Sequence, residues 1–386
     1  CIKLDIDPVT YLVKNAMKKG DRYHNANAEP HPWQYNKTAD WSDLVVKTAD
    51  AFHWSDRFKG WGVPTWVSAD GKKVRGVGVG AAGHSDTGGK PSNANVTLTG
   101  LGAVYLSTCM SEFGAGTRDV MLKVVAEELD MPLESIRVSD SDTGMTPPDF
   151  GSTGSRSTYC GGIVAKRACE DVKKKLYQLA HEKLGLPEDD LEFKGGYVCR
   201  LSNPEEKYFL FPHLMGKVDG VTGCGHFDGV HDSTIFHLQF VEVEVDLEMG
   251  TFKLVDHFGG SDAGVIVNPL PLRNQMQSFF AGIDIACMEE TVWDPNDYRV
   301  LNASNIDYKT RTFNDVVPHD HIVLESMKNT ENDYPFGAVG VGEPLLAPGG
   351  PAIRMAIYNA CGIKLDSYPF SPAKVLKALK EKEANK

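Results

Sequence analysis

The stretch HLQFVEVEVDLEMGTFKLVDHF, residues 237–258, decides the fold class. It contains two runs of alternating apolar and polar residues that are joined through Glu248-Met249-Gly250. Such alternation is typical of half-buried β-strands, and a short glycine-containing connection is typical of a hairpin. We therefore expect an antiparallel pair of strands here.

Helical and glycine-rich patterns surround this hairpin. The runs at 72–83 and 95–108 alternate small and apolar residues and suggest a second antiparallel pair. Residues 20–41 have no clear period, and we interpret them as an ordered surface excursion. Because helices and strands intersperse without a regular strand–helix–strand period, the sequence predicts an α+β fold. Apolar residues recur at helical spacing at about residues 7–20, 42–56, 117–129, 158–184, 273–285, 349–361 and 372–383.

The composition disfavours several classes of protein. The net charge is −12 over 386 residues and there is no concentrated stripe of lysine and arginine, so we do not expect nucleic-acid binding. No apolar run approaches the ~20 residues of a membrane-spanning helix, and residues 1–12 lack the pattern of a signal peptide. The eight cysteines include no C-x-x-C pair, which argues against zinc or iron–sulfur ligation by this chain and favours buried thiols in a reducing cytoplasm.

One glycine motif resembles a dinucleotide-binding loop but lacks its context. Residues 78–83 match G-x-G-x-x-G, yet the residues after them, 84–93, are turn-forming and open no helix. A dinucleotide site requires a helix N-terminus at this point to bind the pyrophosphate. We therefore interpret the motif as an ordinary glycine-rich strand.

A single carboxylate, Glu343, lies in the glycine-rich stretch PFGAVGVGEP, residues 335–344. The flanking glycines allow the backbone to approach a bulky ligand, and Pro344 favours an extended conformation at Glu343. A helix beginning near Pro351 would present its positive end to this loop, which suits an ionised carboxylate acting as a general base. The alternative is an acid that only caps the helix or binds nearby amides.

Three further glycine turns precede helical patterns. Residues 151–157 (GSTGSRS) supply backbone N–H groups, hydroxyls and one guanidinium, which suits a phosphate, although the lysine of a P-loop is missing. Residues 111–117 (SEFGAGT) and 262–269 (DAGVIVNP) form similar turns, and the second is followed by Arg273-Asn274-Gln275. Taken alone, each turn is explained at least as well by a structural role.

Read in chain order, these four stretches resemble the molybdenum hydroxylases, the family of xanthine oxidase and aldehyde oxidoreductase. The resemblance extends over almost the whole chain, from Asp7-Pro8-Val9 to Phe370-Ser371-Pro372 near its end. In that family the large subunit has two halves around the molybdenum cofactor, and this chain is similar to the second half alone. The resemblance implies an elongated α+β cofactor-binding region over residues 1–386, made of two closely packed subdomains whose boundary is not evident.

The resemblance also implies roles for particular residues. Glu343 matches the glutamate that acts as general base toward the oxygen that attacks the substrate carbon. Ser155, Arg156 and Ser157 match positions around the phosphate or dinucleotide part of the cofactor, and Gln275 matches a glutamine that binds the pterin. No residue of this chain is implied as a metal ligand. The implied cofactor-binding residues are Phe113, Gly114, Ala115, Gly116, Thr117, Gly154, Ser155, Arg156, Ser157 and Gln275.

Two positions depart from the family pattern. Ala115 stands where a glutamine is common in the cofactor loop, which removes the donors and the acceptor of an amide side chain. Val339 stands where a lysine or arginine is common. An unusual substrate would be consistent with these departures, and so would a degenerate, inactive subunit.

The function implied by the resemblance is that of a component of a molybdenum hydroxylase complex, a molybdopterin-dependent oxidoreductase. It would hydroxylate or oxidise an electron-poor carbon of an N-heteroaromatic or aldehyde substrate with oxygen from water. The alternatives are an aromatic-CoA reductase subunit of the hydroxybenzoyl-CoA type and a noncatalytic cofactor-carrying or assembly subunit.

The resemblance implies a cofactor and partners as well. The cofactor is molybdenum–molybdopterin in its cytosine dinucleotide form. The expected partners are a chain with the first half of the cofactor-binding subunit, an iron–sulfur chain with [2Fe-2S] clusters and a flavin chain with FAD. All of them are expected in the cytoplasm.

Overall fold

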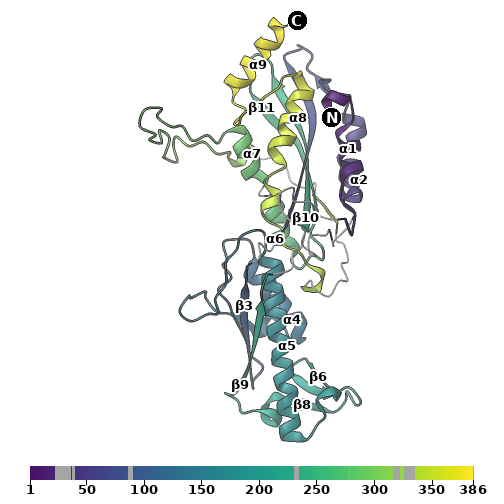
Figure 1. Ribbon diagram of the computed structural model, residues 1–386, viewed down its shortest axis with the longest axis vertical. Helices are drawn as coiled ribbons and strands as arrows, with labels where there is room; N and C mark the ends of the chain where they lie inside the picture. The colour runs from purple at the N-terminus through teal and green to yellow at the C-terminus, as the bar shows by residue number, and fades with distance from the viewer. Residues whose placement is uncertain are drawn as a thin grey trace.

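The computed structural model describes residues 1–21, 36, 40–85, 90–229, 234–277, 279–315, 322–325 and 335–385. These residues form two bodies that are stacked along the long axis of the molecule (Figure 1). We call them the upper body, within residues 1–85 and 234–385, and the lower body, residues 90–229. Sheets and helices intersperse in both, which confirms the predicted α+β class. The surface excursion predicted for 20–41 lies largely outside the described residues.

A five-stranded sheet forms the centre of the upper body, with the strand order β1-β2-β10-β11-β12. The antiparallel pair of β10 and β11 is the hairpin predicted for residues 237–258, and that prediction is confirmed. The predicted pairing of 72–83 with 95–108 is wrong. Instead, β2 pairs with β10, which has the same length of 13 residues. Residues 95–108 pair with each other, as parts of β3 (Ser92–Thr99) and β4 (Val104–Ser107). The strands of this sheet are β1 (Trp66–Val67), β2 (Lys73–Ser85), β10 (Thr234–Asp246), β11 (Phe252–Asp262) and β12 (Ile322–Glu325).

Helices cover both faces of this sheet, so that the upper body has three layers (Figure 1). Side chains of β10 alternate between the faces. Phe240 packs in the core beneath α2 (Trp41–Ala51), and Val241 packs in the core beneath α8 (Gly349–Cys361). Each face therefore has its own apolar core.

Three glycines on one face of β2 explain the glycine-rich motif. Gly76, Gly78 and Gly80 lie directly against the backbone of α8 and of the residue before it. A Cβ atom on Gly78 would lie 2.0 Å from the carbonyl oxygen of Ala352, far inside van der Waals contact. The motif is therefore a strand that lets a helix pack closely, as glycines in strand interiors often do, and the interpretation as a strand is confirmed.

The lower body has two sheets, with the orders β5-β4-β3-β9 and β6-β7-β8. The helices α4 (Thr117–Leu129) and α5 (Ser157–Leu184) pack on the larger sheet, and both agree with the helices predicted from the sequence. Each of them begins beside the upper body, whereas β6, β7 and β8 lie at the far end (Figure 1). The strands are β3 (Ser92–Thr99), β4 (Val104–Ser107), β5 (Ile136–Val138), β6 (Leu191–Lys194), β7 (Tyr197–Arg200), β8 (Lys207–Phe209) and β9 (Gly220–Phe227).

The remaining helices belong to the upper body. The helical region predicted for 273–285 is confirmed in its described part: it is covered by α6 and α7, which lie on either side of residue 278, outside the described residues. α7 packs so closely that a Cβ atom on Gly282 would lie 2.0 Å from the carbonyl oxygen of Leu346. Helical periodicity does not encode such a tertiary contact. These helices are α1 (Pro8–Asn15), α3 (Trp54–Arg57), α6 (Pro269–Gln277), α7 (Phe279–Cys287) and α9 (Pro372–Ala384).

After α7 the chain leaves the compact part of the upper body. Residues 288–312, which we call the arm, extend sideways from it (Figure 1). Within the described residues, no helix is long and apolar enough to cross a membrane. All eight cysteines are free thiols, and Cys1 and Cys224 are exposed rather than buried.

Candidate functional site

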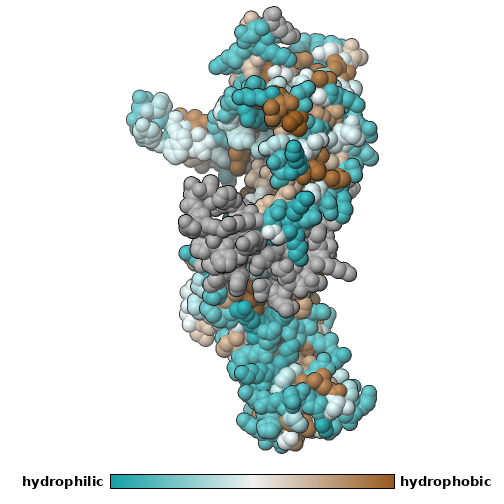
Figure 2. Space-filling view, turned by 45° about the vertical axis from the view of Figure 1, so that its right-hand side comes forward, coloured by the Kyte–Doolittle hydropathy of each residue, from teal (hydrophilic) through white to brown (hydrophobic). Residues whose placement is uncertain are grey.

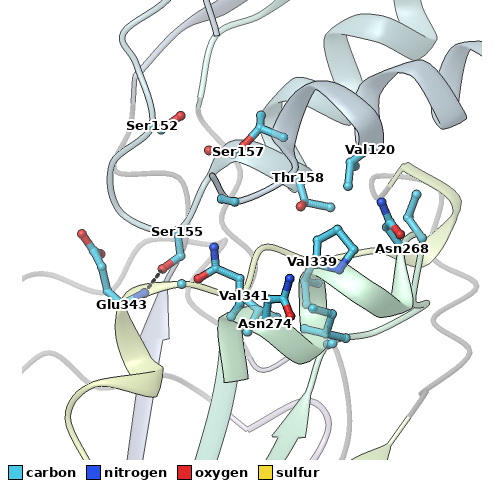
Figure 3. A pocket seen from close by; sticks show the side chains of 18 of the residues that line it. Val120, Ser152, Ser155, Ser157, Thr158, Asn268, Asn274, Val339, Val341 and Glu343 are labelled. Atoms are coloured by element: carbon cyan, nitrogen blue, oxygen red, sulfur yellow. Dashed lines mark hydrogen bonds between the residues drawn. The ribbon is translucent and has the colours of Figure 1, made fainter. Parts of the chain in front are cut away.

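A pocket of about 570 Å³ lies where the two bodies meet. The lower body contributes the turns that precede α4 and α5, and the upper body contributes the segment after β11, α6 and the loop around Glu343. Figure 3 shows the two walls facing each other. All four stretches that were singled out in the sequence therefore converge on one site.

Most of the predicted site residues line this pocket. They are Phe113, Gly114, Ala115, Thr117, Ser155, Ser157, Gln275 and Glu343. The three others, Gly116, Gly154 and Arg156, lie beside it. The roles of all these residues in cofactor binding or catalysis stay predictions.

The turn at the start of α4 is organised by Glu112. This carboxylate accepts hydrogen bonds from the backbone N–H groups of Gly114, Gly116 and Arg118, at 2.7, 3.1 and 3.1 Å. Burial alone would raise the pKa of Glu112, but these hydrogen bonds hold it below its ordinary value. A Cβ atom on Gly116 would lie 2.8 Å from Pro271 of α6, so the turn also contacts the upper body. Sequence reasoning assigned no role to Glu112, although an acid directly before a glycine turn is a signal for such an anchor.

Arg156 is directed away from the pocket. Its side chain is fully buried, and its guanidinium donates to the carbonyl oxygens of Gly151 (3.2 Å) and Lys90 (2.6 Å) and to Ser92 Oγ (2.8 Å). It also forms an ion pair with buried Asp149 at 3.5 Å. These contacts hold the loop before α5 against Lys90 and Ser92, at the start of β3. The geometry therefore supports a structural role for the guanidinium and does not support a contact with cofactor phosphate.

Glu343 lies at the edge of the pocket, where the two bodies touch. Its backbone N–H donates to Ser155 Oγ at 2.9 Å, the contact drawn as a dashed line in Figure 3. Its carboxylate accepts the N–H of Gly154 at 3.3 Å. The acid is thus held by the turn before α5. The predicted orientation by the start of α8 is not found among the described contacts, and the expectation of an extended conformation at Glu343 is wrong, because Glu343 begins a short 3-10 helix, Glu343–Leu345, that precedes α8.

His84, to which the sequence analysis assigned no role, is a neighbour of Glu343. It lies on β2, and its Nε2 is 3.2 Å from the second carboxylate oxygen of Glu343. Gln239 of β10 also contacts this loop, because its Nε2 donates to the carbonyl oxygen of Leu345 at 2.7 Å. Both contacts join residues more than 100 positions apart, so no local pattern could have revealed them.

The upper-body wall is built from the segment after β11 and from α6. Val265 N–H donates to the carbonyl oxygen of Gly337 at 2.9 Å, which places this segment beside the Glu343 loop. Asn268 donates its side-chain N–H to Asp119 of α4 and so links the two bodies. Val339, one of the two positions noted above as departures from the resembled pattern, is buried in this wall.

The chemistry of the pocket fits a large, polar, phosphate-bearing cofactor. Two helices of 13 and 28 residues, α4 and α5, begin at Thr117 and Ser157 on its wall, and helix N-termini favour anions. A Cβ atom on Gly114 or Gly154 would meet no atom within 4 Å, so the backbone of both turns is open to a ligand. No lysine or arginine occurs among the described lining residues, and neutral donors predominate. The polar lining side chains are Thr117, Ser152, Thr153, Ser155, Ser157, Thr158, Asn268, Asn274, Gln275 and Glu343.

A protein-ligated metal ion is not indicated in the described part of the chain, where no group of three or more His, Cys, Asp or Glu residues could hold one.

Comparisons with known proteins agree with the geometry. Residues 48–317 match the family model of the molybdopterin cofactor-binding domain. The chain is 30% identical to the gamma subunit of the 6-hydroxypseudooxynicotine dehydrogenase complex of Paenarthrobacter nicotinovorans, over 80% of this chain and 40% of that protein. It is 25% identical to a putative xanthine dehydrogenase molybdenum-binding subunit of Escherichia coli, over 96% of this chain and 49% of that protein.

The fold is shared with a solved structure. Reconstituted CO dehydrogenase from Oligotropha carboxidovorans superposes with a TM-score of 0.82 and 19% sequence identity, over 100% of this chain and 50% of that chain. The chain thus spans about half the length of the proteins that it matches.

Proposed function

Because this chain belongs to the molybdenum hydroxylases, as a molybdopterin cofactor-binding domain, we propose that it is the second cofactor-binding half of an enzyme that hydroxylates an electron-poor carbon. The single observation that carries the proposal is the position of Glu343 at the edge of a pocket whose walls present hydroxyls, amides and two helix N-termini. The pocket suits the cofactor, and the acid suits a general base.

In this proposal the chain's own residues hold the cofactor and position the base. Ser155, Ser157 and Thr158 would bind phosphate oxygens together with the N-terminus of α5, and Gln275 would bind the pterin edge. When bound, the molybdenum cofactor supplies the oxygen-transfer and redox chemistry.

Glu343 would accept a proton from the attacking oxygen. Its side chain is 52% exposed in this chain alone, so one side of the carboxylate is open to reacting groups. The N–H of Gly154 donates to one carboxylate oxygen and the Nε2 of His84 lies 3.2 Å from the other, so both contacts help to orient the carboxylate.

The substrate class and the partners follow from the same proposal. We propose an N-heteroaromatic or aldehyde substrate and the cytosine dinucleotide form of the cofactor. Because the chain spans only half of the matched proteins, the remaining cofactor-binding half must come from elsewhere, together with [2Fe-2S] and FAD chains in a cytoplasmic complex. An aromatic-CoA reductase would use the same pocket with electrons flowing in the opposite direction, and turnover of candidate substrates distinguishes the two.

Metal and pterin content tests the proposed function. The native complex isolated through this chain is expected to contain molybdenum and a pterin dinucleotide in equal amounts, together with iron. Elemental analysis and nucleotide release measure these contents. An intact complex with neither molybdenum nor pterin would contradict the proposal and would favour a noncatalytic assembly subunit, with Glu343 as a structural loop acid.

Replacing His84 tests how Glu343 is positioned. We expect His84→Ala to lower kcat by about 10- to 100-fold with little change in KM or cofactor content, because a polar contact to a charged group contributes up to about 1.5–3 kcal/mol. His84→Gln keeps a donor and should retain more activity. His226→Ala is the matched control, since His226 lies on β9 and contacts Asn93 instead. Equal losses in the Ala and Gln variants of His84 would contradict the positioning role.

A further inference from the structure

The arm has a defined shape of its own. Trp293 pairs with Val300 in a β-bridge near its middle, and at its base Arg311 forms an ion pair with Asp284 of α7. The hydrogen bonds that residues 291–306 make with other described residues stay within the arm. The body of this chain therefore contributes little to ordering the arm beyond its base.

The arm exposes large apolar side chains along its length. Trp293 and Leu301 are 56% and 55% exposed, and Tyr298 and Ile306 are 75% and 80% exposed. In Figure 2 the arm projects on the left, with pale and brown residues between its teal tip and the upper body. An isolated hairpin is marginally stable in water, and clustered exposed apolar residues mark interaction surfaces. The arm is therefore built to be covered by another protein surface.

The length of the matched proteins indicates what covers it. This chain aligns over its whole length with half of the solved chain, so the matched protein has an equally long half that this chain does not span. Under the proposed function, that half completes the walls of the cofactor pocket.

The pocket and the arm lie on one continuous piece of chain. α6 lines the pocket through Pro271, Asn274 and Gln275, α7 follows it, and the arm begins where α7 ends. A partner that covers the pocket at α6 can continue along α7, where Ile285 is 47% exposed, to reach the arm.

We propose that the arm is a clamp for the missing cofactor-binding half, and that this half encloses Trp293, Leu301 and Ile306 in an apolar groove. This inference rests on the proposed function, because the proposed function supplies the partner that the arm would bind. The groove needs a hydrogen-bond partner for the hydroxyl of Tyr298, since a covered tyrosine hydroxyl is normally paired. Aromatic anchors of this kind dominate the energetics of interfaces.

Site-specific photo-crosslinking in the native complex tests the arm. A photoreactive phenylalanine analogue is introduced at Ile306 and, separately, at Leu301, and the crosslinked peptides are identified by mass spectrometry. We expect both positions to crosslink to the half of the cofactor-binding subunit that this chain does not span, whether that half is on the same or a separate polypeptide. The same analogue at Val218, which is 94% exposed on the lower body, is the control for exposure alone.

Several outcomes would overturn the inference. They are crosslinks to a second copy of this chain, crosslinks to the iron–sulfur or flavin chain, and no crosslink in a complex that is otherwise intact. Molybdenum and pterin are measured in the same preparations. A complex that holds both but crosslinks elsewhere refutes the arm's role and leaves the proposed function standing, whereas a complex without them refutes the function whatever the arm contacts.

A paired variant adds a second readout. Trp293→Ser together with Ile306→Ser is expected to reduce the yield of the crosslink from Leu301 to the other half at least tenfold, while the circular dichroism of the preparation stays unchanged. Met249→Ser, at an exposed turn of the β10–β11 hairpin, is the matched control. An unchanged crosslink yield with the paired variant would contradict the clamp.

Discussion

Turnover is expected to fall by about 10²–10⁴-fold when Glu343 is replaced by glutamine, while molybdenum and pterin stay bound. The expected magnitude is that of losing a general base. Glutamine keeps the size of the side chain and can still accept the N–H of Gly154, but it cannot take a proton from the attacking oxygen. The measurements are kcat and KM for the best substrate, and metal and pterin content of the same preparation.

A matched control separates this chemical effect from a general effect of removing a charge. Glu248→Gln changes an acid that is 60% exposed at the β10–β11 turn and pairs with Lys72 at the surface. This variant should keep full activity. If Glu343→Gln retained wild-type kcat in a cofactor-replete complex, the assignment of the general base would be wrong.

The second large effect is expected at Gly78, and it concerns stability. Gly78→Ala would place a methyl group 2.0 Å from the carbonyl oxygen of Ala352 and 2.6 Å from the nitrogen of Ala356, both in the backbone of α8. Neither atom can move without displacing the helix from the sheet. We expect a loss of at least ~3 kcal/mol in the free energy of unfolding, at the upper end of overpacking effects. Soluble yield and urea unfolding followed by tryptophan fluorescence measure it.

Gly83→Ala on the same strand is the matched control. Its methyl group would lie 3.6 Å from the ring of Trp41, which is ordinary van der Waals contact. The free energy of unfolding of this variant should change by less than about 1 kcal/mol. If the two variants were equally stable, close packing of α8 on β2 would not be the reason for glycine at position 78.

Local patterns were sufficient for much of the fold. The alternation at 237–258 and the periodicity at 117–129 and 349–361 act within a few residues, so the sequence could predict these elements. The pairing of β2 with β10 was not predictable in this way, because it joins strands more than 140 residues apart. The glycines that make it compatible with α8 were visible in the sequence, but their partner was not.

The site could be predicted as a set of stretches but not as a set of contacts. Each of the four stretches carries glycines and polar residues that a local reading can detect. The role of Arg156 was not readable locally, because its ion pair with Asp149 and its bonds to the loop around Lys90 depend on tertiary placement. The same holds for His84, whose pairing with Glu343 spans most of the chain.

The division of the pocket between two bodies has an energetic consequence. The lower body is an insertion between β2 and β10 of the upper body, and each body forms one wall of the pocket. A ligand bound between the walls interacts with both bodies at once. By thermodynamic linkage, a ligand at a hundred times its Kd stabilises the state that binds it by about 2.7 kcal/mol. Part of the binding free energy of such a ligand would then stabilise the contact between the two bodies. In a chain that binds its cofactor late, this contact would be weaker until the cofactor is bound.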